Sequence, residues 1–334
     1  MMMKMKMKMK IKNILLIITL LTGVKSFCQD PHFTQFYSNP LYQAPSFAGA
    51  ISGYRIAANY RDQWIKMPGL LRTINISADM NIDKLNSGLG LIALSDVAGS
   101  ANYSNTYVGL LYSYNIRFTR RCYLRPGLGF YYSQRTLDHE KLVFASQIYA
   151  GDSDVQPVLP EDFHNVHNFD GSVSLLLSLR NSWVGVCADH LLMPNVSLTS
   201  YDYKYPVKLT IFGGTRLYKL ERLISTKRQT VTIAGSYRHQ GQTDQVDVGL
   251  YWSYTKIVLG IWYRDLPLIK DYTRRDAISV LLGFNYKDLN IGYSYDFTIS
   301  RLATSTGGAH ELSLSYKFEI ERKHRFKPVP CPEF

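Results

Sequence analysis

Histidines and carboxylates gather in one stretch of the chain, where the first chemistry to consider is metal binding. His164 and His167 have the His-x-x-His spacing, and Asp152 and Asp162 precede them. Imidazole nitrogens and carboxylate oxygens are ordinary zinc ligands, but a site also needs a rigid element that orients them. The loose spacing within residues 137–168 offers no such element, so we interpret the stretch as a solvated loop and predict no metal site. A long loop of this kind can still bind another protein.

Covalent catalysis has no local signature in this sequence. There is no Gly-x-Ser-x-Gly elbow, no phosphate-binding loop and no paired-carboxylate motif. His190 and His310 fall in serine-rich, strand-like segments, which is weak support for a hydrolase. The four cysteines form no Cys-x-x-Cys pair, so they indicate no zinc site. We therefore predict no enzymatic activity and no cofactor.

Residues 1–28 have the pattern of a cleavable export signal. A lysine-rich region precedes an apolar run at 14–21, and small residues stand before Gln29. Cleavage before Cys28, as in a lipoprotein, is disfavoured by the bulky Phe27. The signal contains six of the lysines and no acidic residue, so the formal charge of +12 falls to +6 in the exported chain. Export and this modest charge argue against nucleic-acid binding.

Apolar residues alternate with small or polar ones along most of the remaining chain. Residues 246–254, 289–297 and 311–318 each place aliphatic and aromatic side chains on one face and mostly Asp, Asn, Ser or Gly on the other. Alternation with period two predicts β-strands. The strand-like segments run about ten to thirteen residues, which matches tilted membrane strands better than the strands of soluble sheets. In lipid every backbone group must be paired, so the sheet must close on itself.

We predict an all-β protein, a closed antiparallel transmembrane β-barrel of about 14 strands within residues 50–319. The strands are expected at 50–62, 71–82, 88–98, 103–117, 122–136, 169–181, 183–192, 205–219, 229–240, 244–254, 256–265, 276–287, 289–300 and 309–319. Short connections alternate with longer ones such as 137–168 and 193–204, which is the asymmetry of an outer-membrane barrel. The pattern predicts an outer-membrane protein with both termini in the periplasm.

The segment 29–49, between the signal and the barrel, is rich in both proline and aromatic residues. Pro31, Pro40 and Pro45 remove backbone donors and exclude a regular helix or a central strand. Its aromatic residues are Phe33, Phe36, Tyr37, Tyr42 and Phe47. Because so much aromatic surface needs something to bury against, we expect the segment to plug the lumen, to strap the barrel mouth, or to dock a periplasmic partner.

Several short motifs follow one another in a specific order along the exported chain. They are the segment 29–49, Asn59-Tyr-Arg-Asp-Gln-Trp64, Ser77-Ala-Asp79, Phe169-Asp-Gly171, Val184–Leu191 and Gly308–Tyr316. In this order they resemble motifs of the PorP/SprF family of type IX secretion system outer-membrane proteins. The resemblance covers almost the whole exported chain.

The resemblance implies a non-enzymatic outer-membrane component of type IX secretion in Bacteroidota, a system linked to gliding and adhesin export. Its partners would be outer-membrane lipid and either machine subunits or the C-terminal domain of a secreted adhesin, whose export or surface anchoring it assists. The residues expected to bind protein partners are Asp30, Pro31, Phe33, Gln35, Phe36, Asn39, Pro40, Tyr42, Pro45, Tyr60, Arg61, Gln63 and Trp64. The rival interpretation is an outer-membrane channel or uptake transporter in which the segment 29–49 is a hatch.

Two candidate contacts also have simpler interpretations. Trp64 can be an interfacial aromatic of the barrel instead of a cargo contact. The tail 320–334 is basic and proline-rich, which is typical of a disordered periplasmic tail. The tail residues that we expect to contact a periplasmic ring subunit are Arg322, Lys323, Arg325 and Cys331.

Overall fold

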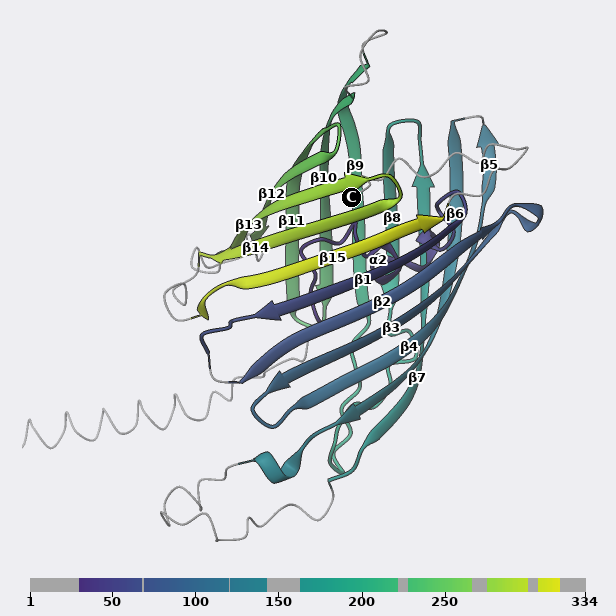
Figure 1. Ribbon diagram of the computed structural model, residues 1–334. Helices are drawn as coiled ribbons and strands as arrows, with labels where there is room; N and C mark the ends of the chain where they lie inside the picture. Colours follow the sequence, from purple (N-terminus) through teal and green to yellow (C-terminus); the bar gives the residue numbers. More distant parts are fainter. Residues whose placement is uncertain are drawn as a thin grey trace, which may run out of the picture. The chain divides into compact units, whose positions relative to one another are not determined.

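The wall of the protein is one antiparallel sheet that closes on itself. The computed structural model describes residues 30–67, 69–119, 121–142, 163–221, 228–265, 275–299 and 306–318, and the chain from Pro31 onward forms one compact unit. Strands pair in chain order around a ring, and β1 (Tyr54–Gln63) pairs with β15 (Ala309–Phe318) to close it (Figure 1). The predicted closed barrel is confirmed. The expected signal at 1–28 and tail at 320–334 lie outside the described residues.

The other wall strands agree with the predicted ones to within a few residues. They are β2 (Leu70–Ile82), β3 (Ser87–Gly99), β4 (Tyr103–Tyr114), β6 (Cys122–Thr136), β7 (Val166–Ser178), β8 (Ser182–Asp189), β9 (Lys208–Glu221), β10 (Arg228–Gln240), β11 (Thr243–Tyr254), β12 (Ile257–Asp265), β13 (Arg275–Tyr286) and β14 (Leu289–Thr298). Single 3-10 turns, at Asp83–Leu85 and His139–Lys141, lie in two of the connections. With β1 and β15, these strands make the ring of fourteen.

One further strand, β5 (Ile116–Thr119), lies outside the ring because β4 pairs directly with β6. The sequence predicted a single strand at 103–117, but β4 leaves the wall after Tyr114. There the Asn115 N–H bonds the carbonyl of Asn86 at 2.7 Å, and the chain then pairs with β6 beyond the barrel. The first wall strand also differs, since β1 begins four residues later than the predicted start at residue 50.

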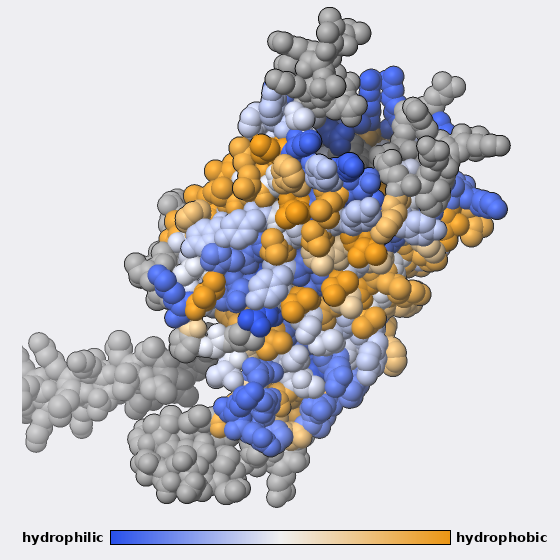
Figure 2. Space-filling view, viewed as in Figure 1, coloured by the Kyte–Doolittle hydropathy of each residue, from blue (hydrophilic) through white to orange (hydrophobic). Residues whose placement is uncertain are grey.

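The outer face of the wall is apolar and the inner face is polar. In β11 the outward side chains of Val248, Leu250 and Trp252 are 39–47% exposed, whereas the inward Asp247 and Tyr251 are 4% and 1% exposed. Figure 2 shows apolar side chains gathered over the middle of the wall, with more hydrophilic residues toward its ends. An apolar outer face is the surface that a bilayer covers. Among the described residues, no helix is both long and apolar enough to cross a membrane.

Exposed aromatic side chains gather near both ends of the strands. Near the end at which β1 begins, they include Tyr54, Tyr112, Tyr286, Tyr316 and Phe318. Near the opposite end, they include Tyr60, Tyr132, Phe169, Tyr263 and Phe297. Between these two rows the outward residues are mainly Ile, Leu and Val. Two aromatic girdles that flank an aliphatic band are the pattern of a membrane-spanning barrel, because each ring is apolar and each hydroxyl meets water.

Inward aromatic rings lie against glycines of the neighbouring strands. A Cβ atom added to Gly249 would lie 2.1 Å from the ring of Trp262, and one added to Gly214 would lie 2.5 Å from the ring of Trp183. The missing side chains therefore make the space in which these rings pack. The buried apolar core of the protein lies inside the barrel and includes both tryptophans.

A charged residue on the outer wall tests the membrane-facing assignment. Ile261 lies at the centre of β12, is 55% exposed and pairs with Val280 of β13. We expect Ile261→Arg to lower the free energy of unfolding by about 2–4 kcal/mol, the cost of a guanidinium near the bilayer midplane. Urea titration in lipid vesicles measures the change, and Ile261→Leu is the control that stays apolar. Unchanged stability of the arginine variant in lipid contradicts the assignment.

Candidate functional site

Residues 31–53, which we call the lumen segment, run inside the barrel without joining its sheet. Two single helical turns lie in it, α2 (Pro40–Gln43) and a 3-10 turn (Pro45–Phe47), and each begins at a proline. Proline suits the first position of a helix because its missing N–H has no helical partner there. Local bonds, such as the one from the Ser38 N–H to the Gln35 carbonyl at 2.9 Å, close further turns. The segment thus satisfies much of its backbone locally.

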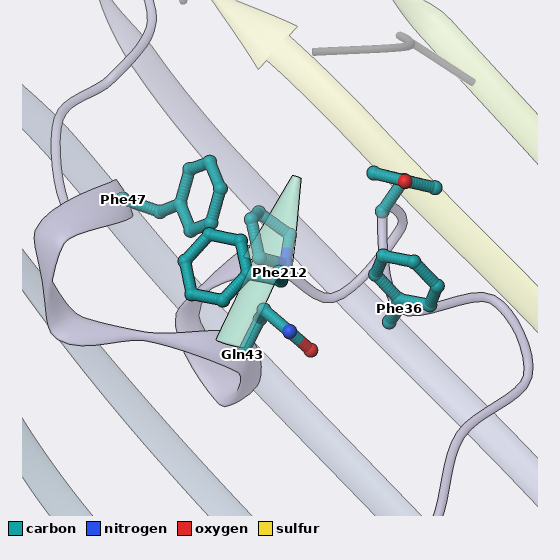
Figure 3. A pocket seen from close by; sticks show the side chains of 6 residues that line it. Phe36, Gln43, Phe47 and Phe212 are labelled. Carbon is teal, nitrogen blue, oxygen red and sulfur yellow. The ribbon is translucent and has the colours of Figure 1, made fainter. Parts of the chain in front are cut away.

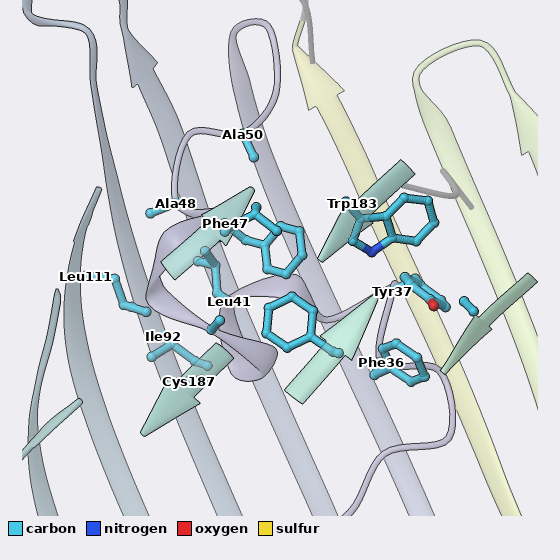
Figure 4. Packing of buried hydrophobic residues seen from close by; sticks show 14 of the residues in the cluster. Phe36, Tyr37, Leu41, Phe47, Ala48, Ala50, Ile92, Leu111, Trp183 and Cys187 are labelled. Atoms are coloured by element: carbon cyan, nitrogen blue, oxygen red, sulfur yellow. The ribbon is translucent and has the colours of Figure 1, made fainter. Parts of the chain in front are cut away.

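Side chains of the lumen segment form the buried core together with inward side chains of the wall (Figure 4). The ring of Phe36 meets that of Trp262 edge to face at 4.8 Å, and the ring of Phe47 lies 5.5 Å from that of Phe212. Other members of the segment in this cluster are Tyr37, Leu41, Ala44, Ala48 and Ala50. The apolar interior therefore depends on both the wall and the lumen segment.

The packing between the lumen segment and β9 is tight. A narrow gap is lined by Phe36, Gln43, Phe47 and Phe212, among others (Figure 3). It is too narrow to admit a water molecule. The gap is therefore too small to hold a ligand.

Two arginines and two acids surround Thr34 near the beginning of the lumen segment. A guanidinium nitrogen of Arg61 lies 2.7 Å from Asp296 and another lies 3.1 Å from Glu311, while Arg264 lies 3.2 Å from Asp296. The Thr34 hydroxyl donates to the Asp296 carboxylate at 2.8 Å and accepts from both guanidinium groups at 2.9 and 2.8 Å. All five residues are 5% exposed or less. We call them the Thr34 anchor.

The carboxylate of Glu311 also binds the backbone of the lumen segment. Its two oxygens accept the N–H groups of Thr34 and Gln35 at 2.7 and 2.9 Å. The Gln35 amide donates to the Ser294 hydroxyl at 3.1 Å and accepts from the Ser313 hydroxyl at 2.6 Å. Hydrogen bonds to an ionised acceptor are about twice as strong as neutral ones, so this contact fixes the segment firmly. Residues of β1, β14 and β15 thereby hold it across the seam where the ring closes.

A second set of contacts holds the other end of the lumen segment. The Arg125 guanidinium donates to the carbonyls of Ser46 and Ala48 at 3.2 and 2.6 Å. The Gly49 N–H donates to the Asp79 carboxylate at 2.9 Å. Both charged side chains point inward from the wall, where Arg125 is 1% and Asp79 is 5% exposed. We call these five residues the Arg125 anchor.

Glycines on the inner wall allow the backbone of the lumen segment to approach closely. A Cβ atom added to Gly127 would lie 2.3 Å from the Ser46 nitrogen, and one added to Gly88 would lie 2.0 Å from the Ala48 oxygen. Both obstacles are backbone atoms, which cannot move aside as the tip of a flexible side chain can. The wall is therefore shaped to receive the segment at the Arg125 anchor.

Most of the residues predicted to bind partners in the lumen segment are buried. Phe33, Gln35, Phe36 and Asn39 are between 0 and 4% exposed. Pro40 and Pro45 are buried as well, whereas Asp30, Pro31 and Tyr42 are half-buried. The Tyr42 hydroxyl donates to the Pro31 carbonyl. The structure brings these residues together inside the barrel, and their role in partner binding stays a prediction.

The four predicted residues at the end of β1 do not share one surface. Tyr60 faces outward and is 36% exposed, whereas its neighbour Arg61 faces the lumen and is 3% exposed. Gln63 and Trp64 are half-buried where the strand ends. The Trp64 N–H donates to the Gly308 carbonyl at 2.8 Å and its φ of 59° turns the chain out of the wall. Arg61 therefore acts in the Thr34 anchor and not at the surface.

One of the two histidines considered for metal binding, His167, contacts a tyrosine. His167 lies on the outer face, where its Nδ1 is 2.8 Å from the hydroxyl of Tyr132. Within the part of the chain that the structure describes, no group of three or more His, Cys, Asp or Glu residues could hold a metal ion. Residues 143–162 and the predicted tail contacts lie outside the described ranges. The tail residues concerned are Arg322, Lys323, Arg325 and Cys331.

The charged wall residues that hold the lumen segment are not among the site residues predicted from the sequence. They are Asp79, Arg125, Arg264, Asp296 and Glu311. A signal for them does exist, because each stands on the inward face of a strand where most other inward residues are neutral. Full charges at such positions indicate a partner inside the barrel.

A closed ring of long strands, an apolar outer face between two aromatic girdles and a polar inner face define a transmembrane β-barrel of the outer-membrane class. A family profile described as "Type IX secretion system membrane protein PorP/SprF" matches residues 25–316. The chain belongs to this PorP/SprF family, as the motifs indicated. Membership of a secretion-system family of membrane barrels supports the predicted outer-membrane localisation.

Three similar solved structures are distant from this chain in sequence. The Ralstonia pickettii toluene transporter TbuX has 11% identity and a TM-score of 0.48, over 84% of this chain and 93% of that one. The CymD monoaromatic hydrocarbon channel has 10% identity and a TM-score of 0.47, over 86% and 94%. The P. putida toluene transporter TodX has 12% identity and a TM-score of 0.43, over 83% and 92%. Such scores carry no argument about function. A comparison with curated proteins finds no match.

Breaking the Thr34 anchor should cost more stability than breaking an exposed ion pair nearby. Arg61→Met leaves the buried Glu311 without its guanidinium partner, so we expect a loss of about 3–5 kcal/mol in the free energy of unfolding. Arg72→Met is the matched control, because Arg72 is 39% exposed and lies 3.8 Å from Asp62. We expect it to cost less than about 1 kcal/mol. Urea titration in lipid vesicles compares the two variants, and equal losses would contradict a special role for the anchor.

A larger residue at the Arg125 anchor should displace the lumen segment. We expect Gly127→Val to push the Ser46 turn off the wall, so that protease cleaves within 31–53 faster by at least about tenfold, or about 1.4 kcal/mol in local opening. Limited proteolysis in detergent followed by mass spectrometry measures the rate. Gly171→Ala is the control, since its nearest new contact is an ordinary 3.8 Å. Equal cleavage of the two variants would show that the segment tolerates the added volume.

Proposed function

We propose that this protein is a non-enzymatic outer-membrane component of type IX secretion that works by binding other proteins. Membership of the family supports a role in type IX secretion. The arrangement of the described residues favours protein binding over transport of solutes. The observation that carries the proposal is the lumen segment, which fills the interior and is held there by two sets of buried charged contacts. A barrel filled in this way binds and positions partners without conducting solutes.

The rival function, an uptake channel with a hatch, requires the lumen segment to leave its site. Leaving would separate Glu311 from two backbone N–H groups and expose Phe33, Phe36 and Phe47. Burial of each such side chain contributes about 1.5–3 kcal/mol, so opening is costly even before the ion pairs are counted. The cost favours a lumen that stays closed while the protein acts.

The partners that we propose are subunits of the secretion machine or the C-terminal domain of a secreted adhesin, whose export or anchoring the barrel assists. Because the lumen segment is buried, such partners first contact the connections between strands at the two ends of the barrel. The connection 190–207 is a candidate, since it exposes Leu192 at 64% and Tyr201 at 82%. Exposed apolar side chains on an ordered connection are typical of protein-binding surfaces.

Crosslinking followed by purification from outer membranes tests the proposed function. We expect a tagged protein to recover secretion-machine subunits or the C-terminal domain of a secreted protein, and Leu192→Asp with Tyr201→Ser to reduce that recovery at least about tenfold. The purified protein should show no steady conductance in planar bilayers. Thr199→Ser, in the same connection, is the matched control. A steady pore that a small hydrophobic solute blocks, without recovery of any secretion protein, would contradict the proposal and favour the channel.

A further inference from the structure

The lumen segment runs in the opposite direction to β1. Near its beginning, Thr34 accepts a hydrogen bond from Arg61, which stands two residues before the end of β1. Near its end, Gly49 contacts Asp79, whose register partner in β1 is Arg55, the second residue of that strand. These two positions in β1 are six residues apart, which is a rise of about 20 Å along the strand. The segment therefore crosses the lumen from the level where β1 ends to the level where it begins.

The first residues of the lumen segment remain near the end of the barrel at which β1 ends. His32 contacts the guanidinium of Arg238, and its Nε2 lies 3.9 Å from Asp247. Arg238 stands two residues before the end of β10, next to the short turn into β11. Pro31 and His32 are half-buried, with the His32 side chain 16% exposed, whereas Phe33 is 1% exposed. The segment thus emerges from the packed interior at this end.

Among the described residues, the interior around Phe36 and Tyr37 is packed with aromatic rings of the wall. The ring of Tyr37 lies 6.0 Å from that of Trp183 and 5.3 Å from that of Tyr251, and Phe36 packs on Trp262. The gap that remains beside these rings does not admit water. Pro31, the first residue of the lumen segment, therefore lies at the end of the barrel at which β1 ends.

The two ends of the barrel differ in the length of their connections. Where β1 ends, the connections are 64–69, 100–102, 137–165, 190–207, 241–242, 266–274 and 299–308. Where β1 begins, they are 83–86, 115–121, 179–181, 222–227, 255–256 and 287–288. Outer-membrane barrels place short turns in the periplasm and long loops outside the cell. By this rule the end where β1 ends faces the exterior.

We propose that the lumen segment threads the barrel, so that Pro31, at its start, lies at the cell surface while β15 ends on the periplasmic side. Phe318, the last residue of β15, pairs with Tyr54 at the beginning of β1, at the opposite end from Pro31. The proposal replaces the sequence-based expectation that both termini are periplasmic. It rests on the direction of the lumen segment and is independent of the proposed secretion role.

Threading places Pro31 beside a long connection. The Pro31 carbonyl accepts from the Tyr42 hydroxyl, and the Tyr42 ring lies 5.5 Å from the ammonium of Lys208. Lys208 is the first residue of β9, directly after the connection 190–207. Any contact that the start of the lumen segment makes with another protein would then be made outside the cell, next to this connection.

Single cysteines at three places test the proposal. One is inserted between Asp30 and Pro31, one replaces the 82%-exposed Tyr201, and one is added after Phe334. Intact cells and lysed cells are treated with a membrane-impermeant maleimide, and the labelling of each variant is compared. We expect the amino-terminal cysteine and Tyr201→Cys to label equally in intact and lysed cells. The carboxy-terminal cysteine should gain at least about tenfold in labelling on lysis, because the outer membrane shields the periplasm.

The background and the folding state are controlled separately. Cys122 and Cys331 are replaced by serine, and this parent chain measures any labelling of the buried Cys187. Heat-modifiable gel migration shows that each variant is folded. Where the inserted cysteine prevents folding, a short epitope inserted at the same place and detected by antibody on intact cells gives the same readout. Labelling of the amino-terminal site only after lysis overturns the proposal, even if the secretion role is correct.

Discussion

A barrel of fourteen strands encloses more space than a small barrel fills with its own inward side chains, and this constraint organises the rest of the structure. The lumen segment meets it with Phe36, Leu41 and Phe47, which join Trp183, Trp262 and Phe212 of the wall in one cluster. Inward glycines are placed where backbone or a ring must approach, as at Gly127 and Gly249. The wall and the filling are thus two parts of one core that happen to be far apart in the chain.

Apolar burial and buried charge contribute differently to this arrangement. Each fully buried aromatic side chain of the segment contributes about 1.5–3 kcal/mol, so burial supplies much of the affinity between segment and wall. Buried ion pairs add little net stability, because removing charges from water costs nearly what their attraction returns. Here the buried charged groups position the lumen segment within the barrel. Glu311 accepts two specific backbone N–H groups and Arg125 donates to two specific carbonyls, which sets the direction and depth of the segment.

The sequence predicted the wall well, because the alternation of apolar and polar residues within each segment indicates the strand, its two faces and its exposed aromatic residues. The inward position of Asp296 and the outward position of Tyr293 both follow from period two within 289–297. The anchors were not predictable in the same way, since Arg61 and Asp296 are 235 residues apart and no local pattern pairs them. The composition of 29–49 indicated that the segment must be buried, but composition does not predict in which direction the segment runs through the barrel. The split of 103–117 into β4 and β5 depends on a backbone hydrogen bond with Asn86. The alternation within 103–117 does not predict this contact either.

The contacts of Thr34 with the last strand have a consequence for how the chain folds. Its backbone N–H bonds Glu311, a separation of 277 residues, which spans almost the whole exported chain. Contacts of such large sequence separation form slowly, because the entropy of closing the loop between them is lost before any stabilisation is gained. Until β15 is in place, the ring has two open edges and the aromatic segment has only part of its binding surface. The chain is therefore most exposed to aggregation in the interval before its final strand pairs with its first.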